Sequence, residues 1–597
     1  MFYRLWFHIG SRRRRQLGAL LALILVTSFA EVVSIGAVLP FLSVLTAPEW
    51  VFAHSAAQPV IKALGLTAPA QLILPLAIAF GAGVLVAGAM RLILLWASTR
   101  YSFAIGADLS ISIYRRTLYQ PYAVHIARNS SEVITGISGK ANGVISSAVL
   151  PALTLISSSV MLVTILIALL VIEPVVALVS FGGFGLIYLF VIRMTRKKLL
   201  ADSQCMARES VQVIKSLQEG LGGIRDVLID GSQATYCQIY RNADLPMRRA
   251  QGNSIFISSS PRYAVEALGM LLITALAYAL VQQADGIGKA IPILGSIALG
   301  AQRMLPILQQ AYSSYTAIQS GQASLQDTLE LLDQPLPDYA DQPVAQTLPF
   351  CKSIRLNKLG FRYSQQTPYV LKQINLTITK GSRVGVIGTT GSGKSTLLDI
   401  VMGLLQPTDG KLEVDGQAVT PGNTRAWQAH IAHVPQAIYL ADSTIEENIA
   451  FGVSKDQIDH RRVRQAAQQA QIAESIESWP KQYQTIVGER GVRLSGGQRQ
   501  RIGIARALYK QADVIIFDEA TSALDNETEF AVMRAIEGLS SDLTILIIAH
   551  RLTTLKNCAQ IVELADGNIK RLGSYQEIVK QSSVEQSNNQ KTSSNAH

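Results

Sequence analysis

Residues 388–396 have the sequence Gly388-Thr389-Thr390-Gly391-Ser392-Gly393-Lys394-Ser395-Thr396, between an apolar segment at 383–387 and a helical pattern at 397–405. A glycine-rich loop between a strand and a helix closes backbone N–H groups around phosphate oxygens, and the helix N-terminus adds a favourable dipole. Lys394 would bring a positive charge to the β- and γ-phosphates, and the Ser395 hydroxyl would reach a bound Mg²⁺. The loop therefore predicts an α/β domain that binds a nucleotide.

Two acidic residues, Asp518 and Glu519, follow the apolar strand pattern Val514–Phe517. An acid at the carboxyl end of a parallel strand lies beside the mouth of the phosphate loop. We expect Asp518 to face Mg²⁺ and Glu519 to accept a proton from the attacking water. Another predicted strand, 543–549, ends in His550. A contact between His550 and the γ-phosphate is favoured there over a structural role.

A second glycine-rich motif, Leu494-Ser495-Gly496-Gly497-Gln498, precedes a predicted helix at 499–508 and offers another anion-binding surface. This motif resembles the signature motif of ABC proteins, and the resemblance extends over nearly the whole chain. Tyr363 in Phe361-Arg-Tyr363 resembles the aromatic residue that stacks on adenine. Gln436 resembles the Q-loop glutamine, and Asp525 in Ser522-Ala-Leu-Asp525 lies in a segment that resembles the D-loop.

The resemblance implies a half-transporter, with one membrane half and one nucleotide half, that works as a homodimer. Two nucleotide domains would face head to tail, so that each ATP lies between Lys394 of one copy and Ser495–Gln498 of the other. Gln436 would act with Glu519 and His550 in catalysis, and with Ser395 and Asp518 at Mg²⁺. Because these motif residues are present, both sites are expected to hydrolyse ATP.

Long apolar runs occupy the first 325 residues, and charged residues make up only 16% of the 597 residues. A run of about 20 apolar residues crosses the roughly 30 Å hydrocarbon layer of a membrane. The runs predict an α-helical six-span transmembrane domain (1–325). Together with the motifs and the resemblance above, the rest of the chain is expected to form a linker (326–350), an α/β P-loop ABC ATPase domain (351–580) and a disordered tail (581–597). The predicted spans are 17–45, 71–98, 144–172, 175–192, 262–281 and 287–309.

The net charge of +11 alone would be compatible with a nucleic-acid partner, but the basic residues gather in particular loops. Arg12–Arg15 and the segments 100–140 and 193–261 are basic, whereas the predicted external loops hold only Lys62 and Lys289. The positive-inside rule then predicts a multi-pass protein of the plasma (inner) membrane, with both termini and the ATPase domain in the cytoplasm. No nucleic acid is expected as a partner, because soluble ABC ATPases that act on DNA lack such spans.

The two long cytoplasmic loops alternate polar and apolar residues at helical spacing, so we expect them to be helical extensions of the spans. Their predicted turns lie near Pro121–Asn129 and Ile229–Tyr236 and resemble the coupling helices of exporters. The family expectation is that these turns transmit closure of the ATP sites to the membrane domain.

Four ionisable residues lie within predicted spans: Glu31, Arg91, Glu266 and Arg303. Charges at this depth are costly, so they are usually paired or functional. Glu31 could pair with Arg91 or Arg303, or the arginines could line a basic cavity for an anionic headgroup such as the pyrophosphate of a lipid-linked sugar.

The segment 29–41 is similar to the first span of bacterial lipid-linked oligosaccharide flippases, and Arg91 and Arg303 fall where those proteins have basic residues. This similarity favours ATP-driven export or flipping of a lipid-linked oligosaccharide, polysaccharide precursor or glycolipid, with Glu31, Arg91 and Arg303 at the substrate site. A multidrug or general lipid exporter, or a non-pumping regulatory ABC membrane protein, is the alternative.

Overall fold

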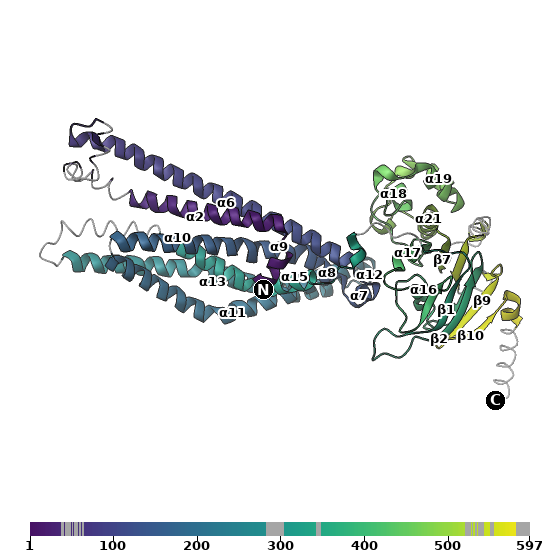
Figure 1. Ribbon diagram of the computed structural model, residues 1–597. Helices are drawn as coiled ribbons and strands as arrows, with labels where there is room; N and C mark the ends of the chain where they lie inside the picture. The colour runs from purple at the N-terminus through teal and green to yellow at the C-terminus, as the bar shows by residue number, and fades with distance from the viewer. Residues whose placement is uncertain are drawn as a thin grey trace, which may run out of the picture. The chain divides into compact units, whose positions relative to one another are not determined.

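The computed structural model (Figure 1) describes residues 1–37, 65–172, 174–281, 304–341, 348–519, 542–549 and 555–580, with isolated positions between 41 and 62 and between 527 and 534. The chain divides into two compact units. The first contains Met1–Gln120 and Ala127–Leu336, and the second contains Pro121–Ile126 and Pro337–His597.

The first unit is helical, and its long helices run side by side (Figure 1). Its elements are α1 (Phe2–His8), α2 (Ser11–Gly36), η1 (Pro69–Leu72), α6 (Ile73–Leu118), α8 (Ser130–Ile134), η2 (Thr135–Lys140), α9 (Ala141–Val144), η3 (Ile145–Val149), α10 (Leu150–Ile172), α11 (Pro174–Gly222), α12 (Ile224–Ile229), α13 (Gln233–Val281) and α15 (Gln322–Leu332). Residues 304–320 are helical as well.

Three stretches of the described residues are long and apolar enough to cross a membrane: Ser11–Ser34, Pro69–Leu118 and Ser130–Ile167. They overlap the first three predicted spans. The predicted fourth and fifth spans lie in α11 and α13. Most of the predicted sixth span, 287–309, lies outside the described residues, and so does the predicted tail at 581–597. The number of spans therefore stays a prediction.

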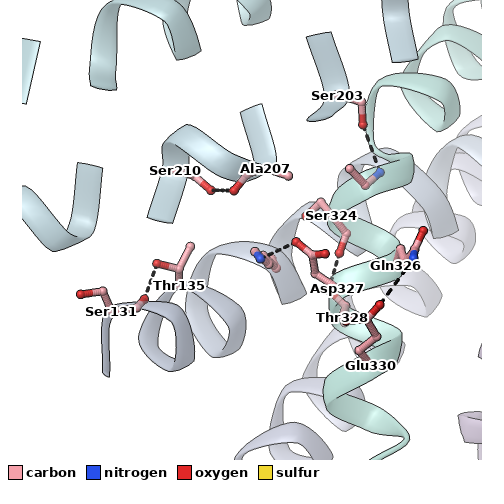
Figure 2. A network of polar contacts seen from close by, with 12 residues as sticks. Ser131, Thr135, Ser203, Ala207, Ser210, Ser324, Gln326, Asp327, Thr328 and Glu330 are labelled. Carbon is pink, nitrogen blue, oxygen red and sulfur yellow. Dashed lines mark hydrogen bonds and ion pairs between the residues drawn. The ribbon is translucent and has the colours of Figure 1, made fainter. Parts of the chain in front are cut away.

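A buried polar network joins α15 to its neighbours in the first unit (Figure 2). Lys140 at the end of the π-helical segment η2 is 8% exposed, and its Nζ lies 2.5 Å from Asp327 Oδ2 on α15. The Ser203 hydroxyl on α11 accepts a hydrogen bond from the Ala323 N–H of α15 at 3.1 Å. A buried ammonium needs such a partner because desolvation disfavours its charge. The network thus fixes α15 against two other helical segments.

The helical extensions and the start of the linker differ in detail from the sequence-based boundaries. The second turn falls between the end of α11 at Gly222 and the start of α13 at Gln233, slightly before the predicted 229–236. The predicted linker start at 326 falls inside α15, which continues to Leu332 because its apolar face is buried. Immediately after α15, the chain is held by its neighbours: Asp333 bonds to Arg4 and His8, and Gln120 Nε2 donates to the Pro335 carbonyl at 2.9 Å.

The second unit contains two sheets and a set of helices. The strands are β1 (Ser353–Phe361), β2 (Leu371–Thr379), β3 (Arg383–Gly388), β4 (Asp409–Val414), β5 (Gln417–Ala418), β6 (Ile431–Val434), β7 (Val514–Asp518), β8 (Thr544–Ile548), β9 (Gln560–Ala565) and β10 (Asn568–Gly573). The helical elements are α7 (Tyr122–Ala127), η4 (Asp338–Asp341), α16 (Lys394–Val401), α17 (Thr424–Gln428), α18 (Ile445–Ile449), η5 (Lys455–Gln457), α19 (His460–Gln469), α20 (Ala473–Glu477), η6 (Gln482–Gln484), η7 (Glu489–Gly491) and α21 (Gly496–Tyr509).

The six-stranded sheet has the order β10-β9-β3-β8-β7-β6, and β10 is its antiparallel edge strand. β3 pairs in parallel with β8 and β9, and β7 pairs in parallel with β8 and β6. The carboxyl ends of β3, β7 and β6 therefore meet at one edge, where ligands bind in open α/β sheets. The four-stranded antiparallel sheet, β2-β1-β4-β5, shares a buried core with α16 and with Trp427, which is fully buried.

Candidate active site

The loop between β3 and α16 has a backbone that suits glycine. Gly388 has φ 152°, and a Cβ there would lie 2.3 Å from the Leu564 carbonyl oxygen. Gly393, just before α16, has φ 98°, and a Cβ there would lie 2.7 Å from a methyl carbon of Leu371. A side chain at either position would collide with packed neighbours. Residues other than glycine also rarely adopt these φ values. At Gly391, nothing in the described part of the chain lies within 4 Å of the Cβ position, so that side of the loop is open.

Lys394, the first residue of α16, folds back over this loop. Its Nζ donates to the carbonyl oxygens of Gly388 and Thr389, at 2.9 Å and 3.0 Å, and the residue is 8% exposed. Ser392 is also buried, and its hydroxyl has no hydrogen-bond partner among the described residues. A buried polar atom left unsatisfied is costly. An incoming phosphate oxygen would satisfy the hydroxyl and could replace the carbonyl contacts of the ammonium.

The acidic pair lies two strands away, at the end of β7. Glu519 has φ 51°, a conformation that costs energy for a residue with a Cβ and recurs at functional sites. Its N–H donates to the Ile548 carbonyl at 3.2 Å. Its carboxylate accepts a hydrogen bond from Gln436 Nε2 at 2.7 Å. The structure therefore brings together the predicted base and the predicted Q-loop glutamine, which are 83 residues apart.

Burial and mutual repulsion shape the electrostatics around the acidic pair. Burial raises the pKa of the Asp518 carboxyl, the Glu519 charge raises it further, and the Lys394 ammonium lowers it. A third carboxylate, Asp399 on α16, has its pKa raised to about 6 by burial and by Asp518. Sequence analysis did not identify Asp399. The site therefore concentrates negative charge around one ammonium.

Tyr363 lies next to the start of α16 and exposes a flat ring. Its hydroxyl shares a hydrogen bond with the Thr396 hydroxyl at 3.2 Å, and its ring meets Phe361 edge to face at 5.0 Å. The side chain is 53% exposed, which leaves ring surface for a base to stack on. Tyr122 of α7 lies near these residues. Burial raises the pKa of its hydroxyl most, and the nearby Asp399 and Tyr363 raise it further. The predicted coupling turn at 121–129 thus contributes a residue to the second unit.

The signature-like motif forms the N-terminus of α21. The Ser495 hydroxyl accepts the Gln498 N–H at 3.2 Å, and the Gln498 side-chain oxygen accepts the Ser495 N–H at 2.9 Å. This reciprocal pair is a capping box, which the Ser-x-x-Gln spacing itself encodes. Leu494 is only 7% exposed and packs in the adjacent core, so its side chain is structural. The exposed Ser495 and the half-buried Gly496 and Gly497 remain accessible at the helix start.

Other predicted site residues take their positions at the same sheet edge or fall outside the described part. Thr389, Thr390 and Ser395 are exposed on the loop and on the first turn of α16. His550, Asp525 and Arg303 lie outside the described residues.

Comparison with known proteins identifies the family. A model described as "ABC transporter" matches residues 371–522, and a model described as "ABC transporter transmembrane region" matches residues 17–293. The ATP-dependent lipid A-core flippase of Thiobacillus denitrificans is 30% identical over 479 residues, which cover 79% of this chain and 81% of that protein. The chain belongs to the ABC transporter family. The flippase of the same name from Alkalilimnicola ehrlichii is 31% identical over 403 residues, which cover 66% of this ABC transporter and 67% of that relative.

A solved structure supports the fold of this ABC transporter. A bacterial Atm1-family ABC exporter with ATP bound matches with a TM-score of 0.78 and 23% identity, over 95% of this chain and 96% of that one. The expected combination of a helical transmembrane domain and an ABC nucleotide-binding domain is thereby confirmed. The chain is an exporter half-transporter of the multi-pass membrane type. Its ATPase domain binds ATP, and hydrolysis is coupled to transport.

Asp399 is expected to make the ATPase unit less stable as the pH rises from about 4 to about 6. Its folded pKa of about 6 exceeds the ordinary 3.8, so the folded state keeps a proton that the unfolded chain has released. Stability is then full below pH about 4 and is lost as the pH rises through 6. Asp399→Asn should raise the free energy of unfolding at pH 7.5 by roughly 1–2 kcal/mol, a figure discounted for partial exposure.

Thermal melting of the nucleotide-free protein at pH 5 and pH 7.5 tests this expectation. The stabilisation by Asp399→Asn should be smaller at pH 5. Asp456→Asn, the same replacement at an exposed position of the same unit, is the matched control and should change little at either pH. Equal stabilisation by Asp399→Asn at both pH values would contradict the raised pKa that burial and Asp518 give this carboxyl.

Proposed function

We propose that the chain forms a homodimer that flips or exports a lipid-linked oligosaccharide, polysaccharide precursor or glycolipid across the inner membrane. The observation that carries this proposal is the set of curated relatives named for flipping a lipid, lipid A-core, at 28–31% identity over about two thirds or more of the chain. The basic character of the predicted cytoplasmic loops supports an orientation with the termini and the ATPase domain in the cytoplasm.

In the proposed site, backbone N–H groups of residues 388–396 and the Lys394 ammonium bind the β- and γ-phosphates, and Tyr363 stacks on adenine. Ser395, Gln436 and Asp518 would hold Mg²⁺. Their oxygen atoms are the hard ligands that Mg²⁺ prefers, and the excess of carboxylates around Asp518 fits a divalent cation. When bound, the ion would neutralise charge that develops on the transferred phosphoryl oxygens.

Glu519 is the proposed general base, and Gln436 holds it in position through the 2.7 Å hydrogen bond. His550 is proposed to contact the γ-phosphate. The exposed start of α21, with Ser495, is proposed to bind the nucleotide held by the partner copy, with Asp525 nearby. Each closed site then needs both copies, so ATP drives closure through its higher affinity for the closed dimer.

Within the first unit, Arg91 bonds to Glu31, one of the two pairs that the sequence allowed, whereas Arg303 lies outside the described residues. Arg91 Nη2 lies 2.5 Å from Glu31 Oε1, and the two side chains are 44% and 2% exposed. Glu266 pairs with Arg262 on its own helix at 2.7 Å. An arginine has five N–H donors, so the exposed side of Arg91 can still receive an anionic headgroup. We propose that Glu31 orients Arg91 for that purpose.

A double replacement separates pairing from substrate binding. Arg91→Gln should destabilise the protein, by at most about 3 kcal/mol, because it removes an ion pair of the buried Glu31 carboxylate. Glu31→Gln with Arg91→Gln should recover most of that loss in a thermal melt. If Arg91 also binds the headgroup, the double variant will be stable yet at least tenfold slower in transport. Restored transport in the double variant would limit Arg91 to pairing.

Reconstitution tests the proposed function as a whole. The purified protein in liposomes is given a fluorescent lipid-linked oligosaccharide, and its movement between leaflets is followed with and without Mg-ATP. Movement that requires ATP and is lost in Glu519→Gln supports the proposal. Hydrolysis of ATP without movement of this lipid, but with movement of drugs or simple lipids, would replace it by the multidrug or general lipid alternative.

A further inference from the structure

A groove between α2 and α6 lies outside the proposed substrate residues and the nucleotide site. It is open on one side and has a volume of about 620 Å³, and its walls include Arg13, Gln16 and Leu23 on α2 and Trp96, Arg100 and Phe103 on α6. Such a volume suits a small ligand or a lipid headgroup. Arg13 and Gln16 precede Leu20 and Leu23 on α2, and Arg100 follows Trp96 on α6, which runs the opposite way, so the charged residues lie toward one end of the groove.

The arginines around the groove differ in how many hydrogen bonds and ion pairs they already make. Arg13 is fixed: Nε lies 2.8 Å from Asp108 Oδ2, Nη1 donates to Gln16 at 3.0 Å, and its carbonyl accepts the Tyr101 hydroxyl at 3.2 Å. Arg14 is also occupied, by the Ile9 and Trp6 carbonyls. Arg100 is exposed and has no ion pair or hydrogen bond within the described part of the chain. The groove therefore holds one oriented guanidinium and one that is available.

The surroundings add more positive charge. Arg12 and Arg15 are exposed, and Arg12 precedes Gln16 by one helical turn on the groove side of α2. Asp108 is the carboxylate that contacts this cluster, and it is bonded to Arg13. The lining of the groove contains two arginines, Arg13 and Arg100, and no carboxylate, and Asp108 beside it is bonded to Arg13. That balance favours an anionic ligand.

The position of the groove matches a membrane boundary. Arg13 lies just before the predicted span 17–45 and Arg100 just after the predicted span 71–98, so both guanidinium groups belong at headgroup depth. Trp96, which is 66% exposed, lies about one turn nearer the bilayer than Arg100 and would lie beside the acyl chains, whereas Phe103, which is 57% exposed, follows Arg100 and lies at headgroup depth. The adjacent helix α1 exposes Tyr3 and Phe7 while burying Leu5 in the same core as Leu20 and Tyr101. Aromatic residues of this kind concentrate at the interface of the bilayer.

We propose that this groove is a binding site for an anionic phospholipid of the surrounding leaflet. Arg13 and Arg100 bind its phosphate, and its acyl chains lie along Trp96 and Leu23. The lipid is a resident of the transporter and not its cargo, so the proposal holds for any transported substrate.

Native mass spectrometry of the full-length protein tests the site, with detergent micelles that contain equal amounts of phosphatidylglycerol and phosphatidylcholine. The wild type should retain phosphatidylglycerol preferentially. Arg100→Gln should reduce that retention about fivefold, the effect of one basic residue at an anionic surface, while Arg100→Lys should keep it. Arg193→Gln is the matched control, because Arg193 is another exposed arginine just beyond a predicted span, and it should leave retention unchanged.

A second variant keeps the test decisive if Arg100→Gln does not fold. Gln16→Glu places a carboxylate at an exposed position of the same groove and should also lower phosphatidylglycerol retention. Unchanged retention in both groove variants would overturn the proposal, as would an equal loss in Arg193→Gln. A lower dimer fraction with unchanged lipid retention would assign the groove to the partner copy instead. None of these outcomes depends on the leaflet-movement assay for the transported lipid.

Discussion

Glu519→Gln is expected to lower the rate of ATP hydrolysis by about 10²–10⁴-fold, the range for loss of a general base, while ATP still binds. Glutamine has the shape of glutamate and can keep the contact with Gln436 that now measures 2.7 Å. The backbone of residue 519, with its N–H bonded to the Ile548 carbonyl, is unchanged by the replacement. The substitution therefore removes the proton acceptor while keeping both of these contacts.

Steady-state hydrolysis and ATP-dependent thermal stabilisation are the paired measurements for this variant. Hydrolysis should fall, whereas the rise in melting temperature with ATP should equal or exceed that of the wild type, because bound nucleotide is no longer consumed. Gln436→Ala should reduce the rate less, since it removes a hydrogen bond to Glu519 and one proposed Mg²⁺ ligand but leaves the base itself in place. A Glu519→Gln variant with a tenth or more of wild-type activity would place the base elsewhere, and His550 would then be the next candidate.

The elements of the nucleotide site that local sequence determines could be predicted. The loop at 388–396 has its glycines where the backbone needs positive φ or close approach, and Asp518 and Glu519 end a strand that must be central because it is apolar throughout. These features depend on neighbours in the chain. The fold class followed from the same information, since long apolar runs and a strand–loop–helix motif each have few structural solutions.

Features that depend on tertiary contacts were missed or left open. Asp399 lies within an apolar helical run, and only the approach of β7 to α16 places it near Asp518. Tyr122 of α7, which is far from Asp399 in the sequence, also lies near it in the structure. Sequence allowed Glu31 either Arg91 or Arg303, because spacing along the chain does not say which helices are adjacent. The structure shows the pair with Arg91, and Arg303 lies outside the described residues. The capping box at Ser495 was different, because its Ser-x-x-Gln signal was present in the sequence but was interpreted only as anion binding.

Lys394→Met should lose ATP binding as well as hydrolysis, whereas Glu519→Gln should lose hydrolysis alone. Without nucleotide, the ammonium is held by the Gly388 and Thr389 carbonyls and is largely buried. Methionine keeps the length of the side chain and its apolar stem, so the loop should still fold. A hydrogen bond to a charged group contributes about 1.5–3 kcal/mol, and its loss predicts an ATP affinity lower by about 10–100-fold. Hydrolysis should fall further, because the phosphoryl charge is no longer stabilised.

Lys510→Met offers a matched control for that experiment within the same unit. The Lys510 ammonium also bonds two backbone carbonyls, those of Gln428 and Ile431, at 3.0 Å and 2.5 Å, but it lies on no predicted nucleotide motif. Its replacement should lower the melting temperature and leave the ATP-dependent rise intact. Lys394→Met should show little response to ATP, even if its melting temperature falls as much as that of Lys510→Met. If both variants lose the same affinity, the effect of Lys394 is structural; if Lys394→Met binds ATP normally, the ammonium does not bind phosphate.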